Sequence, residues 1–188
     1  RHYLGFDTDA DYVAAAEARI ADEVAALDRA PSPVVVVPPT RLDRPDSADV
    51  TAMVAQGRKA VEVAHAVLSA AGCPTVTDVI GIRGLPVDVD LRVEAPDGSE
   101  YLVVVAGAFT TGLAGLRRSD VLHRTLATAA VLRATDVGLP VIVVTTDLPS
   151  GGSSQARALD AVTGTDIAAV IDLSSADPVA EAVAALAG

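Results

Sequence analysis

Two short apolar runs constrain the fold of this 188-residue chain more than any other feature: residues 100–106 (EYLVVVA) and 141–146 (VIVVTT). Both are rich in β-branched residues, and neither leaves a polar face for water. We therefore expect two buried strands, with residues 100–106 at the centre of a sheet. The intervening residues, from about 118 to 135, have helical spacing, so the chain is predicted to be α/β.

The neighbouring segments are predicted to complete one domain over residues 48–188. Apolar residues at helical spacing indicate a helix over residues 49–71, which ends at Gly72 and Pro74. The remaining elements are expected in this order: strands at 75–82 and 86–95, then, after residue 146, a helix at about 153–163, a strand at 167–171 and a short helix at 178–187.

Residues 86–95 alternate between apolar and charged side chains, as in a strand with one buried face. The Asp97-Gly98 pair predicts a tight turn that joins this strand to residues 100–106 as a hairpin. The alternation predicts an apolar face made of Val87, Val89, Leu91 and Val93. It predicts a charged face made of Asp88, Asp90, Arg92 and Glu94.

The first residues of the chain indicate a separate βα unit. A short apolar stretch leads into Asp7, and Thr8 or Asp9 can cap a helix whose apolar positions continue to Leu27. Ligands of doubly wound sheets lie beyond the carboxyl ends of the strands, where an acid can accept hydrogen bonds from both ribose hydroxyls of an adenosyl group. Asp7 is such an acid, although any βα unit with an acidic helix cap would also fit.

This stretch resembles a segment of the exocyclic-amino DNA methyltransferases, which methylate adenine or cytosine with S-adenosylmethionine. The family segment reads roughly G-R-x-Y-I-G-I-D-x-x-x-x-Y-x-x-x-A-x-x-R-I. It is matched here by Arg1, Tyr3, Leu4, Gly5, Phe6, Asp7, Tyr12, Ala16, Arg19 and Ile20. The resemblance implies that Asp7 binds the ribose of S-adenosylmethionine in a Rossmann-like sheet.

Two other motifs of that family, the F-x-G-x-G turn and the D-P-P-Y type loop, do not occur in the sequence. We therefore expect residues 1–30 to be the C-terminal βα remnant of a methyltransferase domain, and this chain alone to be inactive. Residues 31–47 contain five prolines and several charges, which is typical of a linker. Within it, Val34–Val37 is a candidate edge strand.

The expected order of residues 48–188 resembles the core of the PD-(D/E)xK nuclease-like superfamily, the restriction-endonuclease-like fold: helix, three-stranded meander, helix, strand, here with an extra C-terminal βα. The resemblance is one of topology rather than motif. It implies an acid near the start of the second strand and an E-x-K on the third, which together hold a metal. Asp88 or Asp90 lies at the first place, but Val104, Val105 and Ala106 stand near the second.

Three carboxylates could still form a metal site, namely Asp88 and Asp90 on the strand and Glu62 on the preceding helix. Magnesium prefers oxygen ligands, commonly one or two carboxylates with phosphate and water. On one interpretation these are the catalytic residues of a nuclease. On the other, the aspartates form the solvated face of a hairpin. The missing acid and lysine favour a degenerate, non-cleaving domain, for which no metal is predicted.

The glycine-rich loop and helix between Gly107 and Arg133 are the best remaining candidate for DNA contact. Glycines allow the backbone to approach phosphates, and a helix N-terminus attracts anions. A surface loop with solvated arginines is the alternative. The residues concerned are Gly107, Gly112 and Gly115 in the loop and Arg117, Arg118 and Arg124 at and after it.

Composition limits the possible functions. The net charge of −11 is unfavourable for a DNA-binding protein, so any DNA contact should be local or made by another part of a larger protein. A single cysteine, Cys73, excludes an internal disulfide. No apolar run reaches the roughly 18–20 residues of a membrane span, and no signal peptide opens the sequence, so a cytoplasmic location without membrane contact is expected.

The sequence therefore predicts the C-terminal region of a DNA-modification methyltransferase, as found in restriction–modification systems. S-adenosylmethionine would be the cofactor of the complete enzyme, and DNA its partner. The accessory domain would be non-cleaving and would contact DNA or a protein, either as a homodimer or with a restriction subunit. An active Mg²⁺-dependent DNA endonuclease and a protein-interaction or target-recognition module remain alternatives.

Overall fold

The computed structural model describes residues 13–14, 17–18, 20–21, 34–36, 59–108, 114–135 and 137–187. The chain divides into two compact units, Arg1–Pro33 and Val34–Gly188. The described residues of the first unit are helical, as expected for the helix after Asp7. Asp7 itself lies outside the described residues.

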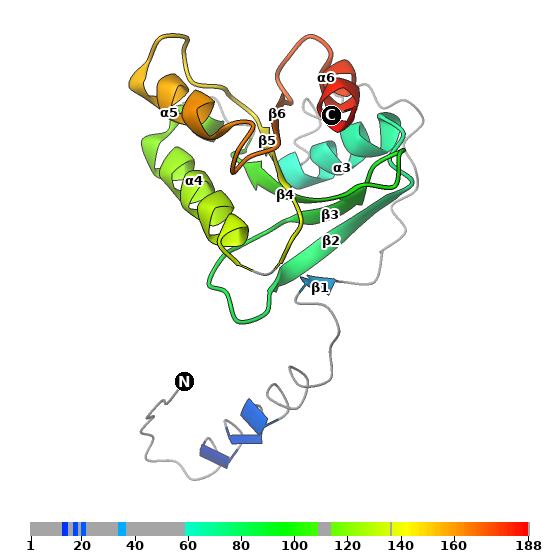
Figure 1. Ribbon diagram of the computed structural model, residues 1–188, viewed down its shortest axis with the longest axis vertical. Coiled ribbons are helices and arrows are strands. Elements are labelled where there is room, and N and C mark those ends of the chain that lie inside the picture. Colours follow the sequence, from blue (N-terminus) through cyan, green and yellow to red (C-terminus); the bar gives the residue numbers. More distant parts are fainter. Residues whose placement is uncertain are drawn as a thin grey trace. The chain divides into compact units, whose positions relative to one another are not determined.

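The second unit is built on a six-stranded sheet whose strand order, β1 to β6, is the order of the chain. The first four strands are antiparallel, whereas β4, β5 and β6 run parallel. The sheet therefore changes from antiparallel to parallel at β4 (Figure 1). The strands are β1 (Val34–Val36), β2 (Thr75–Ile82), β3 (Leu91–Glu94), β4 (Glu100–Ala106), β5 (Val141–Thr145) and β6 (Ala169–Asp172).

Helices cover both faces of this sheet. Helices α3 and α6 pack on one face, and α4 and α5 pack on the other (Figure 1). A short 3-10 helix, η1, precedes α4. Their bounds are α3 (Ala60–Ala70), η1 (Gly115–Arg117), α4 (Ser119–Arg133), α5 (Ser154–Val162) and α6 (Pro178–Leu186). The α/β class is thus confirmed.

Each face of the sheet has its own hydrophobic cluster, and β4 contributes to both. The side chains of Leu102 and Val103 are completely buried and point to opposite faces. Burying such a side chain contributes about 1.5–3 kcal/mol, so β4 is central to the core, as predicted. The α3-side cluster includes Val63, Leu68, Leu91, Val93, Val103, Ile142 and Leu186. The α4-side cluster includes Val89, Leu102, Val104, Leu122, Leu132, Val143 and Leu159.

Most predicted elements are confirmed to within a few residues. The strands at 75–82 and 100–106 have the predicted bounds, and residues 34–36 form an edge strand paired with β2. The described part of the helix predicted at 49–71 is α3, which is followed by Gly72 with a φ of +95°. The first turn of α5 is capped by Ser153, whose hydroxyl accepts a hydrogen bond from the Ala156 N–H.

The strand predicted at 86–95 begins five residues late, at Leu91. The regular alternation breaks at Asp90, because Val89 packs in the α4-side cluster and Leu91 in the α3-side cluster. The Asp90 N–H donates to the Val103 carbonyl, but the next N–H of the ladder, on Val105, is bound by the Asp90 carboxylate. The prediction of one continuous apolar face was therefore wrong.

Among the described residues, no helix combines the length and the apolar character that crossing a membrane requires.

Candidate functional site

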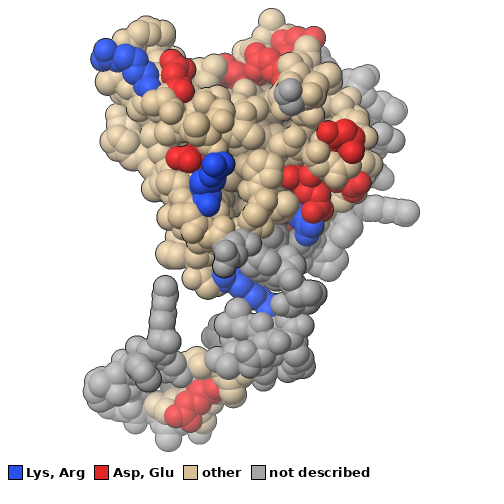
Figure 2. All heavy atoms as spheres, in the orientation of Figure 1, with Lys and Arg blue, Asp and Glu red and all other residues tan. Residues whose placement is uncertain are grey.

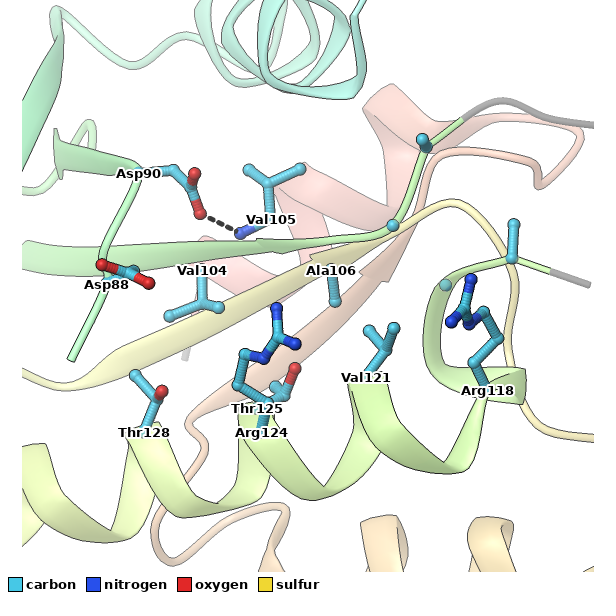
Figure 3. A pocket seen from close by; sticks show the side chains of 14 residues that line it. Asp88, Asp90, Val104, Val105, Ala106, Arg118, Val121, Arg124, Thr125 and Thr128 are labelled. Atoms are coloured by element: carbon cyan, nitrogen blue, oxygen red, sulfur yellow. Dashed lines mark hydrogen bonds between the residues drawn. The ribbon is translucent and has the colours of Figure 1, made fainter.

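A pocket of about 430 Å³ opens between β4 and α4, next to the residues that precede β3 (Figure 3). Asp88 and Asp90 line one side of it, and Val104 and Ala106 of β4 form its apolar floor. Its α4 side consists of Val121, Arg124, Thr125 and Thr128. Its loop end consists of Gly107, Ala108, Ala114, Gly115 and Arg118.

The two acids of the pocket differ in their surroundings. Asp90 accepts a 2.7 Å hydrogen bond from the Val105 N–H (Figure 3), whereas Asp88 is exposed. Burial raises the pKa of Asp90; the hydrogen bond from Val105 opposes this shift, and the negative charge of Asp88 adds to it. Asp90 is therefore bound to the backbone of β4, and Asp88 faces solvent.

The structure separates the three predicted DNA-contact arginines. Arg118 lines the pocket but binds both carboxylate oxygens of Asp120, at 3.1 and 3.0 Å. Arg117 does not line it, and its guanidinium lies 3.4 Å from the Asp147 carboxylate. Arg124 is exposed and has no hydrogen-bond or ion-pair partner among the described residues. Its guanidinium extends from α4 toward β4 (Figure 3).

Two further polar residues of the pocket, Thr125 and Thr128, were missed at the level of sequence. They are only 4% and 6% exposed, and within the described part of the chain neither hydroxyl has a hydrogen-bond partner. Both lie on the α4 surface that faces the pocket (Figure 3). The spacing of Val121, Thr125 and Thr128, four and then three residues, is a signal that could have identified them, because it places hydroxyls on the sheet-facing side of the helix.

The glycines next to the pocket have a structural reason that the sequence did not reveal. A Cβ at Gly107 would lie 2.5 Å from the Thr146 hydroxyl, and one at Gly115 would lie 2.5 Å from that of Thr145. Both glycines have positive φ, of +121° and +53°. Close packing against the end of β5 therefore accounts for these two glycines without a phosphate. Gly112 lies outside the described residues.

The three carboxylates considered as candidate metal ligands do not all lie together. Glu62 lies on α3, on the face of the sheet opposite α4, and does not line the pocket. Within the described ranges, no group of three or more His, Cys, Asp or Glu side chains is arranged to hold a metal ion. The prediction that Asp88 and Asp90 share one face of a strand was wrong, because β3 begins at Leu91, after both residues. Both residues nevertheless line the pocket.

Charge is distributed unevenly over the second unit. Figure 2 shows acidic side chains in several groups on the visible face and basic side chains at scattered positions. On this face, the basic side chains do not form a continuous basic surface.

No protein-family model, curated protein or solved structure matches this chain. Any assignment of function is therefore based on the fold and on the chemistry of the pocket residues.

Proposed function

We propose that this chain is part of an S-adenosylmethionine-dependent DNA-modification methyltransferase, in which the second unit is a nuclease-like domain that contacts DNA without cutting it. The methyltransferase assignment is supported by the segment around Asp7, whose residues match the family pattern. The observation that carries the role of the second unit is the pocket at β4, where Asp88 and Asp90 lie across from the unpaired guanidinium of Arg124 within the described residues.

The arrangement of elements supports a nuclease-like ancestry. Helix α3 is followed by the antiparallel strands β2, β3 and β4, then by α4 on the other face and by β5 parallel to β4. This order supports the resemblance to the restriction-endonuclease-like core that the sequence predicts. The pocket lies beside Asp90 and β4, where that fold would hold its metal.

The chemistry of the pocket supports DNA contact without cleavage. The pocket-facing positions of β4 are Val104 and Ala106, which can neither bind a metal ion nor transfer a proton. One oxygen of Asp90 is already bound to the Val105 N–H. Arg124, in contrast, can donate charge-assisted hydrogen bonds to a phosphate, which are about twice as strong as neutral ones.

We expect Arg124→Ala to weaken binding of duplex DNA for all sequences alike, because phosphate contacts carry no sequence information. The slope of log affinity against log salt should become shallower by about 0.9, because one arginine no longer neutralises a phosphate. Arg117→Ala and Arg118→Ala should have smaller effects, because Asp147 and Asp120 already neutralise these side chains. Fluorescence anisotropy at several salt concentrations measures all three.

The matched control is Arg157→Ala, which removes an exposed arginine of α5 that has no partner among the described residues. The same DNA, incubated with magnesium or manganese, should remain uncut. Unchanged affinity and slope in Arg124→Ala would exclude the DNA contact and favour a protein partner. Cleavage that disappears in Asp90→Ala would instead establish an active nuclease.

A further inference from the structure

The pocket between β4 and α4 is lined by two hydroxyls that the protein itself does not bind. Thr125 and Thr128 are more than nine-tenths buried as residues, and their hydroxyls have no partner within the described residues. Both hydroxyl oxygens are exposed to the pocket and are not enclosed in the core. They can therefore donate hydrogen bonds to a polar ligand in the pocket.

The charges around the pocket limit which ligand can fill it. A simple anion would be attracted by Arg124 but repelled by Asp88 and Asp90. A simple cation would be attracted by the two aspartates but repelled by Arg124. A ligand that binds both the aspartates and Arg124 must present a hydrogen-bond donor to the aspartates and negative charge to Arg124. These groups come from two different elements, the segment before β3 and helix α4 (Figure 3).

The surface between these polar groups is apolar. Val104 and Ala106 of β4 and Val121 of α4 line it, and Figure 3 shows all three between the aspartates and the loop end of the pocket. Such a surface suits the flat face of an aromatic ring. The volume of about 430 Å³ lies within the range of small-molecule sites, roughly 300–1,000 Å³.

We infer that this pocket binds a single nucleotide whose base carries an exocyclic amino group. The amino group donates to the carboxylate of Asp88, as carboxylates accept from the amino group of cytosine. The base lies against Val104 and Ala106. The phosphate binds Arg124 and accepts hydrogen bonds from the hydroxyls of Thr125 and Thr128. The inference goes beyond the sequence-independent DNA contact proposed above and rests on the pocket alone.

Nuclear magnetic resonance titration of the isotope-labelled chain tests this inference. Deoxyadenosine and deoxycytidine monophosphate should shift the amide signals of Val105 and Thr125. Thymidine monophosphate lacks the amino group and should bind roughly tenfold more weakly, or weaker still. Deoxyadenosine, which lacks the phosphate, and inorganic phosphate, which lacks the base, should each also bind more weakly.

Two variants separate the two ends of the ligand. Arg124→Gln should strongly reduce the advantage of deoxyadenosine monophosphate over deoxyadenosine. Asp88→Ala removes the acceptor of the amino group and should abolish the preference for amino-bearing bases while leaving the phosphate advantage intact. Arg157→Gln and Asp160→Ala on α5, which change residues away from the pocket, should leave both preferences unchanged.

A single-stranded oligothymidine with one central adenine distinguishes the two sources of such a ligand. Tighter binding than deoxyadenosine monophosphate identifies a nucleotide within a DNA strand, and equal or weaker binding identifies a free nucleotide. The inference is overturned if no nucleotide shifts the pocket amides, or if thymidine monophosphate binds as tightly as the others. Weaker duplex binding in Arg124→Ala, combined with no response to any nucleotide, would support the DNA contact and overturn only the nucleotide site.

Discussion

Asp90 shows how one side chain can stabilise a strand end and shape a site at the same time. As a free carboxylate it would be a candidate metal ligand. In the structure its Oδ2 accepts the Val105 N–H at 2.7 Å and so takes the place of a backbone acceptor where β3 has not yet begun. One carboxylate oxygen is therefore bound to the backbone of the sheet, and the residue also lines the pocket.

We predict that Asp90→Ala destabilises the domain by about 1–3 kcal/mol, because the Val105 N–H loses its acceptor. Asp90→Asn keeps an acceptor oxygen and removes a charge whose burial is unfavourable. Because the folded-state pKa of Asp90 is raised, its contribution to stability is present at low pH and is lost as the pH rises through that pKa. The Asn variant should therefore be more stable than the natural chain at pH 7.

The advantage of Asp90→Asn should disappear as the pH falls through the pKa of Asp90. Urea denaturation at a series of pH values measures both effects, with Asp160→Asn on the exposed surface of α5 as the control. An Asn variant that is destabilised at pH 7, and not below the pKa of Asp90, would show that the domain requires the negative charge of Asp90 and would contradict this prediction.

At the scale of elements, the position of α4 depends on how η1 is fixed to the end of β5. Thr145 is fully buried; its hydroxyl donates to the Ala106 carbonyl at 3.0 Å and accepts from the Leu116 N–H at 3.2 Å. The Leu116 N–H also donates to the Asp147 carbonyl. These bonds join β4, η1 and β5, and so they set the width of the pocket between β4 and α4.

Gly115→Ala should disrupt this junction. The added Cβ would lie 2.5 Å from the Thr145 hydroxyl and 2.6 Å from the Asp147 nitrogen, at a φ of +53°. Overpacking costs about 1–3 kcal/mol and left-handed backbone a further ~1–2 kcal/mol, so we expect a decrease of about 2–5 kcal/mol in unfolding free energy.

Gly84→Ala is the control for this substitution, because Gly84 also has positive φ, of +75°, but no atom within 4 Å of the added Cβ. It should reduce the unfolding free energy by only about 1–2 kcal/mol for the backbone conformation. Equal decreases in the two variants, measured by the midpoint of urea denaturation, would mean that the close contact between η1 and β5 adds nothing to stability.

At the scale of the whole molecule, the chain combines two units with different sequence signals. The first carries the segment that resembles a methyltransferase cofactor strand, and the second forms its own sheet with two hydrophobic clusters. A core on each face of the sheet makes the second unit compact by itself. The proposed function therefore assigns the cofactor chemistry and the DNA contact to different units.

In the complete methyltransferase that we propose, Asp7→Ala should weaken S-adenosylmethionine binding. Charge-assisted hydrogen bonds contribute about 1.5–3 kcal/mol, so the dissociation constant should rise roughly 10- to 150-fold. Titration calorimetry measures this change, and Asp9→Asn is the control within the same segment. The 188-residue chain alone should bind the cofactor negligibly, and micromolar binding by it, or an unchanged constant in Asp7→Ala, would contradict the assignment.

The sequence alone determined the order of the elements and the central position of β4, because both depend on local pattern. Residues 102–106 are apolar on both faces and include three valines, and only a strand covered on both sides can bury such a run. Gly72, Asp97-Gly98 and Ser153 marked a helix end, a turn and a helix cap through their own backbone and side-chain preferences.

Only the tertiary structure decided which candidate residues meet in a site. The break at Asp90 depends on Val105, fifteen residues later, and the neutralisation of Arg117 depends on Asp147, thirty residues later. Thr125 and Thr128 became candidates because α4 packs its polar side chains over the apolar floor of β4. Local patterns specify which elements form, whereas the partners of a polar side chain are set by contacts that are distant along the chain.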